Sequence, residues 1–197
     1  ANFSTPGNTY NVNVWISANN DSDPSNDSLL GLSVKNIAPN YISSNDSLWE
    51  NFSGNTSINI TGNFANGWKA NPEANYFWTI ENYYTQSGTG PYYDHTSGNS
   101  SGRIAFVQTF TYLDGQNAYL TSPCIELADT ISNAVPVLSF WYHKYGSNMG
   151  DLFVEIQDNN FTWITLDSII GQTHFTYSDP YLFKEIDLSN YTGLGTN

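Results

Sequence analysis

The run Leu138-Ser139-Phe140-Trp141-Tyr142-His143, followed after a short connection by Leu152-Phe153-Val154-Glu155-Ile156, decides the fold class of this chain. Apolar residues occupy every second position, which is the period of a β-strand with one face in the core. Tyr145-Gly146 and Met149-Gly150 bracket a connection short enough to join neighbouring strands. The alternation predicts an inward set of Leu138, Phe140 and Tyr142 and an outward set of Ser139, Trp141 and His143.

The same pattern continues from Ser47 onward in short runs separated by Gly, Asn and Pro. The predicted strands are residues 76–80, 103–109, 117–121, 137–142, 152–157, 163–170 and 181–188. Helical periodicity is missing from these runs. Many short strands with recurring turn signals are typical of antiparallel sandwiches and jelly rolls, so we predict an all-β jelly-roll β-sandwich.

Composition and charge favour a protein that works outside the cell. Charged residues make up 12% of the chain and aromatic residues 16%, while Asn, Ser and Thr supply much of the polarity. Five basic residues stand against 18 acidic ones, a net charge of -13. Such a surface repels phosphate backbones and anionic lipids, so we expect no nucleic-acid partner and no membrane insertion. It suits calcium, which prefers oxygen ligands.

Cys124 is the only cysteine, so neither an intrachain disulfide nor a cysteine-based metal site can form. Proteins without disulfides are often cytosolic. The composition favours an exported surface protein instead, and we expect an extracellular, secreted location. Because Cys124 lacks a partner and follows Ser122-Pro123, we predict a buried free thiol.

Residues 1–40 show a separate pattern, which predicts a β-hairpin. Tyr10, Val12 and Val14 alternate with polar residues, as do Leu30, Leu32 and Val34 after a turn-rich stretch. The Gly7-x-x-Tyr10-x-Val12-x-Val14 strand and the loop at residues 21–27 resemble the end of the immunoglobulin-like repeats of bacterial surface proteins. We therefore expect residues 1–40 to be the last strands of such a repeat plus a linker, and residues 41–197 to be a second domain.

The second domain carries a longer set of motifs. In order, they are Gly67-Trp68, Gly90-Pro91, Asp94-His95-Thr96, Gly98, Gly102, Leu120-x-Ser122-Pro123, Leu138 to Val154, and Asp187-Leu188-Ser189-x-Tyr191. Together they resemble the MAM domain, the jelly-roll module of cell-surface adhesion proteins. The resemblance implies non-catalytic adhesion. Paired cysteines of animal members are missing, and the closing strands of the family would follow Tyr191. We therefore expect an incomplete jelly roll with unpaired sheet edges that favour self-association.

Asp94 beside His95 invites an acid–base or metal interpretation. The resemblance implies instead a structural loop, with a calcium ion held by Asp94 and Glu50 as the metal hypothesis. His143 and His174 lack metal-ligand spacing, and we expect His143 to face outward. Glu185 and Asp187 resemble part of a glycosidase strand, but the third carboxylate is missing, so an exposed polar strand face is predicted.

Two further surface features follow from the sequence. Four Asp-Ser/Thr-aliphatic triplets resemble the O-glycosylation pattern of Bacteroidota, with acceptors at Ser28, Ser47, Thr130 and Ser168. Aromatic residues that could stack on sugar rings are Trp68, Tyr83, Tyr84, Tyr92 and Tyr93, and a core position is the alternative for them.

These observations predict a non-catalytic extracellular adhesion or assembly module of a large bacterial surface or filament protein. Its expected partners are other protein subunits or surface glycans, with possible calcium. The alternative is an accessory module, binding substrate or carbohydrate for a secreted protease or polysaccharide-degrading enzyme.

Overall fold

The computed structural model describes residues 9–15, 28–35, 40–42, 48–56, 62–71, 77–82, 89–108, 115–127, 135–158 and 161–191. The regular elements within these ranges are strands and two single turns of 3-10 helix, which confirms the all-β prediction. The chain divides into two compact units, residues 1–40 and 41–197. Among the described residues there is no helix that could span a bilayer.

The first unit contains an antiparallel hairpin of β1 (Thr9–Trp15) and β2 (Ser28–Lys35). Val12 pairs with Leu32, but Val14 pairs with Leu29, so β2 carries one extra residue at this point. A β-bulge of this kind reverses the side-chain alternation beyond it. Leu30, which the simple alternation placed with Leu32, is accordingly 68% exposed.

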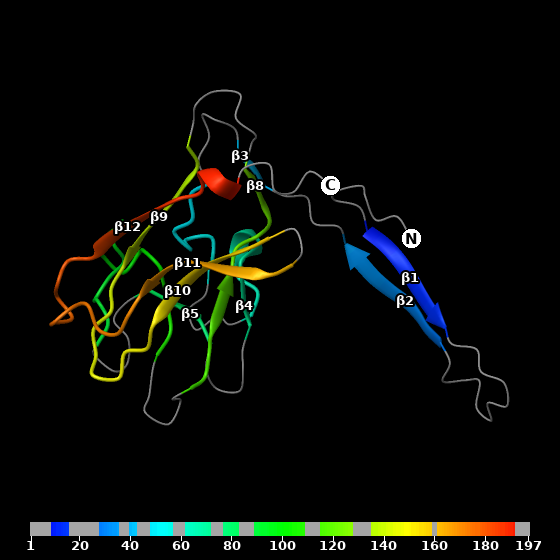
Figure 1. The fold of residues 1–197 in the computed structure, drawn as a ribbon. Coiled ribbons are helices and arrows are strands. Elements are labelled where there is room, and N and C mark those ends of the chain that lie inside the picture. Colours follow the sequence, from blue (N-terminus) through cyan, green and yellow to red (C-terminus); the bar gives the residue numbers. More distant parts are fainter. Residues whose placement is uncertain are drawn as a thin grey trace. The chain divides into compact units, whose positions relative to one another are not determined.

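The described residues of the second unit contain ten short strands (Figure 1). They are β3 (Asn40–Ile42, whose first residue belongs to the first unit), β4 (Lys69–Asn71), β5 (Thr79–Glu81), β6 (Ile104–Phe106), β7 (Tyr119–Thr121), β8 (Ile125–Leu127), β9 (Val137–Tyr142), β10 (Leu152–Gln157), β11 (Trp163–Ile169) and β12 (Leu182–Asp187). The 3-10 turns are η2 (Ala65–Gly67) and η4 (Ser189–Tyr191).

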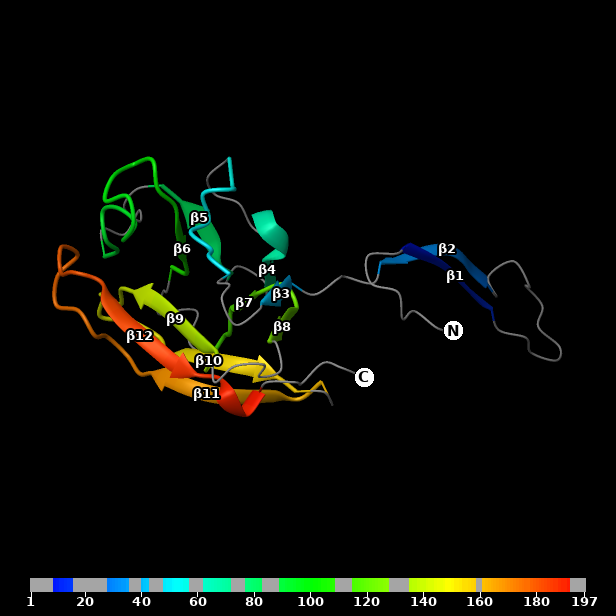
Figure 2. The ribbon, with the colours of Figure 1, turned by 90° about the horizontal axis from the view of Figure 1, so that it is seen from above.

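These strands pair as β3–β8, β4–β7, β5–β6, β9–β12 and β10–β11, and the last four pairs are antiparallel. Figure 2 shows β9 to β12 in one layer, with β4, β5 and η2 in the layer opposite. The arrangement is that of a two-layer β structure, in which each layer buries one face against the other. The connection order of a jelly roll stays a prediction.

The β9–β12 pair follows the predicted alternation except at Leu182, which pairs with Tyr142 but is 40% exposed at the start of β12. Exposed and half-buried residues alternate along β9, and Phe183 of β12 pairs with Trp141 while Ile186 pairs with Leu138. Ile186 is buried, whereas Trp141 and Phe183 are 43% and 50% exposed. One face of the pair therefore contributes to the core, and the other presents aromatic rings to solvent.

The most deeply buried cluster lies in the opposite layer. Phe64, Ala70 and Ile80 form its centre, and Ile80 is fully buried. Partly buried apolar residues surround them: Phe52, Trp68, Trp78, Ala105 and Leu120. The Trp78 indole donates a hydrogen bond to the carbonyl of Ala118 (3.1 Å), so the polar atom of this large side chain is satisfied.

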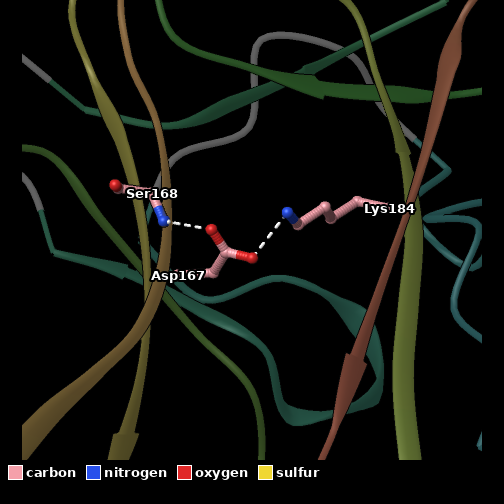
Figure 3. A network of polar contacts seen from close by, with 3 residues as sticks. All are labelled: Asp167, Ser168 and Lys184. Carbon is pink, nitrogen blue, oxygen red and sulfur yellow. Dashed lines mark hydrogen bonds and ion pairs between the residues drawn. The ribbon is translucent and has the colours of Figure 1, made fainter.

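The β11 and β12 strands are linked by a side-chain ion pair (Figure 3). Lys184 Nζ lies 2.5 Å from Asp167 Oδ2, and the backbone N–H of Ser168 donates to Asp167 Oδ1 (2.7 Å). The Lys184 ammonium group is the main reason that the pKa of Asp167 lies below its usual value. A one-residue shift in the β10–β11 register, between Val154 and Glu155, places Asp167 opposite Val154 on the inward side.

Cys124 is exposed, so the prediction of a buried thiol is wrong. It lies between β7 and β8, just before β8 begins at Ile125. The prediction assumed that a cysteine without a partner behaves as a small core residue. In a connection between two short strands, however, no alternation forces a given side chain inward.

Candidate binding surface

The outward face of β9 and β12 is extended by the loop that contains His95. The imidazole ring of His95 stacks on the indole of Trp141, with ring centroids 3.8 Å apart and planes 11° from parallel. Trp141 in turn contacts Phe183 on the neighbouring strand (4.9 Å). A loop distant in sequence is thereby fixed onto the sheet, which gives His95 a positioning role.

A second contact fixes the same loop. The hydroxyl of Tyr181, just before β12, donates a hydrogen bond to the carbonyl of Tyr93 (2.8 Å). Burial, and to a lesser extent the charge of Asp94, raises the pKa of Tyr181 above its ordinary value, so the hydroxyl stays a donor even at alkaline pH. Tyr92 packs edge-to-face against Tyr177 (4.8 Å).

We call the exposed or partly exposed rings of this region the aromatic face. They form two groups of touching rings, which the Tyr181–Tyr93 hydrogen bond joins: Tyr92, Tyr93 and Tyr177, and His95, Trp141, Tyr181 and Phe183. Tyr92 and Tyr93, predicted as sugar-stacking residues, belong to it and are 48% and 42% exposed. Trp68 does not belong to it, because it packs on Phe52 (5.6 Å) beside the core. Tyr83 and Tyr84 lie outside the described residues.

Acidic and small polar residues continue the aromatic face along the same two strands. Glu185 pairs with Ser139 and Asp187 with Val137, and all four are exposed. The Lys184 side chain lies on the opposite face, toward Asp167. Glu185 and Asp187 therefore share one exposed strand face, as the alternation predicted, and their charge disfavours anionic partners.

The loop behind His95 is organised by Asp94. The Asp94 carboxylate accepts hydrogen bonds from the backbone N–H groups of Thr96 and Ser97 (both 3.0 Å) and from the Ser97 hydroxyl. Its oxygens lie so close to Gly102 that a Cβ atom there would overlap them. Gly102 is therefore needed for space, not for a special backbone angle.

Glu50 has a similar local role. Its carboxylate accepts a hydrogen bond from the backbone N–H of Phe52 and one from the side-chain amide of Asn66 (2.9 Å). Arg103 links this segment to the Asp94 loop, because its guanidinium donates to the carbonyl groups of Asn55 and Gly102. Within the described residues no three His, Cys, Asp or Glu side chains converge on one point. Calcium at Glu50 and Asp94 stays a prediction.

His143 does not face solvent as expected; the prediction was wrong. The strand ends at Tyr142, and the imidazole of His143 lies against that of His174, with ring centroids 4.0 Å apart. Both ring nitrogens of His143 are buried without a hydrogen-bond partner. Burial and the neighbouring His174 lower the pKa of His143 from 6.5 to about 4.

His174 is in contrast fully bonded and only 2% exposed. Its Nδ1 accepts the backbone N–H of Lys144 (3.1 Å), so its Nε2 carries the hydrogen and donates to the carbonyl of Pro180 (3.1 Å). The Lys144 side chain is also buried and donates to the carbonyl of Ile169. This group holds together the ends of β9 and β11 and the start of β12. No spacing rule signalled it, because its members come from separate connections.

The predicted glycosylation positions fall in different settings. Ser168 is exposed on β11, next to Asp167. Ser28 is the first residue of β2, and only its backbone is described. Ser47 and Thr130 lie outside the described residues.

The described strands and the exposed aromatic face define an all-β domain with two layers. Residues 61–188, well over half of the chain, match the MAM domain family, meprin/A5/mu, and the chain belongs to this family. The matched region contains Asp94 but not Glu50. A similar relative is neuropilin-1a of Danio rerio, which is 32% identical over 90 residues.

That similarity covers 45% of this chain and 9% of the relative, so the chain spans only a small part of that protein's length. No solved structure matches. MAM domains are adhesion-type modules.

Proposed function

We propose that this chain is a non-catalytic extracellular module that mediates adhesion or assembly by docking its aromatic face on another protein subunit. The observation that carries the proposal is the exposure of Trp141 and Phe183, side by side at the centre of an otherwise regular strand pair. Large aromatic residues at the centre of a surface are the type of residue that dominates protein–protein binding energy.

The chemistry of the surroundings supports a protein partner. Ser139, Glu185 and Asp187 give the aromatic face a polar, acidic margin. A rim of this kind favours a partner with complementary positive charge and raises its association rate. The net charge of -13 acts in the same direction and disfavours nucleic acid and anionic lipid.

The experiment compares two phenylalanines of similar exposure, Phe183 (50%) and Phe153 (55%). Beads coated with the full chain are mixed with beads carrying the chain itself or a candidate surface protein, and aggregation is followed by light scattering. Phe183→Ser should reduce aggregation about tenfold or more, the effect of losing a central aromatic contact. Phe153→Ser changes a residue that is 55% exposed on the outer side of β10, outside the aromatic face, and should aggregate like the parent. Equal behaviour of the two variants would refute the assigned face.

A second candidate function is carbohydrate binding in a secreted enzyme. The observation that favours it is the proximity of exposed rings to Glu185 on one strand face, because sugar rings stack on aromatics while their hydroxyls donate to carboxylates. Soluble neutral oligosaccharides distinguish the two. The carbohydrate function is the correct one if these oligosaccharides bind the parent chain, if Phe183→Ser abolishes that binding, and if beads coated with the chain do not aggregate with protein-coated beads.

We further propose the setting in which the module works. It belongs to a large bacterial surface or filament protein, follows the end of an immunoglobulin-like repeat, and carries O-linked glycan at Ser168. The exposure of Ser168 in its Asp-Ser-Ile triplet supports the last point. Mass spectrometry of natively expressed protein tests it, since an unmodified Ser168 peptide would contradict it.

A further inference from the structure

The outward face of β12 carries a row of three side chains that begins on an aromatic ring and continues in two carboxylates. Phe183, Glu185 and Asp187 are all exposed on this face, because outward positions of a strand recur every second residue. Within the described residues, the Glu185 carboxylate has neither a hydrogen bond nor an ion pair. Asp187 accepts the backbone N–H of Ser189 (2.7 Å), which lowers its pKa and keeps it charged.

The strands of this layer offer these carboxylates no counter-charge. β9, β10 and β11 contain neither Lys nor Arg, and β12 contains Lys184 alone. Figure 3 shows the Lys184 side chain reaching Asp167 on the inward side, so its charge is already engaged there. Neutralising charge for Glu185 and Asp187 therefore has to come from a binding partner or from ions in solution.

A second copy of this chain is poorly suited to supply that charge. The five basic residues stand far apart in sequence, at positions 35, 69, 103, 144 and 184. Lys144 is buried, Lys184 is paired, and the described bonds of the Arg103 guanidinium go to carbonyl groups. Lys35 and Lys69 remain, and they belong to different units of the chain. Two copies with a net charge of -13 each also repel one another.

We propose that the aromatic face binds an extended basic segment of a different protein, in which one apolar and two basic residues occupy three alternate positions, with the apolar residue at one end. Because this segment docks on the aromatic face, the inference rests on the function proposed above. Successive side chains of the row on β12 are about 6.8 Å apart. A partner in strand conformation presents alternate side chains at the same spacing. Its apolar residue meets Phe183 and Trp141, and its basic residues meet Glu185 and Asp187.

The two parts of the row have different tasks in this arrangement. Central aromatic residues such as Trp141 and Phe183 supply most of the affinity of a protein contact. Exposed carboxylates mainly raise the association rate and exclude partners of the wrong charge. We therefore expect Phe183 to hold the segment, while Glu185 and Asp187 select it.

A pair of synthetic peptides with identical composition tests the spacing on the full chain. In the in-phase peptide, one leucine and two lysines occupy alternate positions of a blocked serine background. In the out-of-phase peptide, both lysines are moved by one residue, which turns them to the opposite side of the strand. Immobilised chain should bind the in-phase peptide roughly fivefold or more tightly, and less tightly as salt is added. Equal binding of the two peptides, or binding of neither, overturns the proposal.

Charge variants assign the selection to β12. Glu185→Gln and Asp187→Asn should each slow the association of the in-phase peptide about threefold and weaken its salt dependence, with melting temperatures like that of the parent. Glu155→Gln, the same charge change at an exposed position on β10, should behave like the parent. The double variant Glu185→Lys/Asp187→Lys should reject this peptide and bind one with glutamates in place of the lysines. Unchanged association in both single variants overturns the proposal.

Failure of this inference can be told apart from failure of the docking function. If Phe183→Ser prevents bead aggregation while the two peptides bind the parent alike, the aromatic face still docks a protein, but the basic segment is wrong. If beads coated with the chain aggregate with one another, and Phe183→Ser prevents it, a second copy is the occupant and the inference is wrong. Equal aggregation of Phe183→Ser and Phe153→Ser refutes the docking function itself, and this inference with it.

Discussion

Lowering the pH should destabilise this chain through His143. The ring nitrogens of His143 have no partner within normal hydrogen-bond geometry, and the His174 imidazole stacks close beside the ring. The backbone of Thr176 and the carboxylate of Asp179 favour the charged ring only weakly, so the pKa falls to about 4. His143 is therefore protonated near pH 6.5 in the unfolded chain but only near pH 4 in the folded chain. Stability from this group is complete above pH 6.5 and is lost as the pH falls toward 4.

The magnitude follows from the size of that shift. A fall in the pKa of His143 from 6.5 to about 4 corresponds to about 3 kcal/mol at 1.36 kcal/mol per unit. The ring is not fully buried, and solvent screening reduces the effect to roughly 1.5 kcal/mol. For a chain of this size, that equals a decrease of about 5 °C in melting temperature between pH 7 and pH 4.

The assay is thermal unfolding at several pH values for the parent and for His143→Phe. Phenylalanine keeps the ring contacts with His174 and Tyr181 and cannot be protonated, so its melting temperature should depend less on pH. Glu81 acts in the opposite direction, because its raised pKa means that protonation at lower pH stabilises the folded state. This contribution is the same in both proteins, so the comparison cancels it. Equal pH dependence of the two proteins would refute the reasoning.

His174→Phe is the contrasting variant. It removes the bonds to Lys144 and Pro180 and should lower stability at every pH, by about 2 kcal/mol or more. Stability unchanged at pH 7 would contradict the assigned bonding.

Three further outcomes are expected. Gly102→Ala should lower the free energy of unfolding by about 2 kcal/mol, because its Cβ overlaps the Asp94 carboxylate; a melt identical to the parent would show that the loop yields freely. Cys124 should react with a thiol reagent within seconds in the native protein, and labelling that requires denaturant would mean that the thiol is covered. If calcium binds at Glu50 and Asp94, Asp94→Asn should lose part of the stabilisation that Ca²⁺ confers on the parent, and an unchanged response would remove Asp94 from the ligands.

Strand positions were the part of the fold most open to prediction. The limits of β9 and β10 were predicted to the residue, and those of β12 to within one residue at each end, because period-2 patterns specify a strand. Bulges set the limit of this reasoning. Leu30 is exposed because β2 carries an extra residue, and the register shift between β10 and β11 also interrupts the alternation there. A pattern of period 2 contains no signal for the residue at which its phase changes.

The aromatic face and the histidine pair could be predicted only in part. The resemblance drew attention to the Asp94-His95 segment, but only the structure shows that His95 stacks on Trp141. His143 was misplaced because the alternation of β9 ends one residue before it. Contacts between connections depend on tertiary packing, which local patterns do not encode.

The stacking of His95 on Trp141 means that the proposed contact surface is discontinuous along the chain. Residues 95, 141 and 183 meet only in the folded unit, so peptides copied from either strand should not compete for a partner, and an antibody against this region would recognise a conformational epitope. Thermodynamic linkage adds a second consequence. A partner that touches loop and sheet at once stabilises the fold in proportion to the logarithm of its concentration, so each adhesive contact protects the module against unfolding and proteolysis for as long as it lasts.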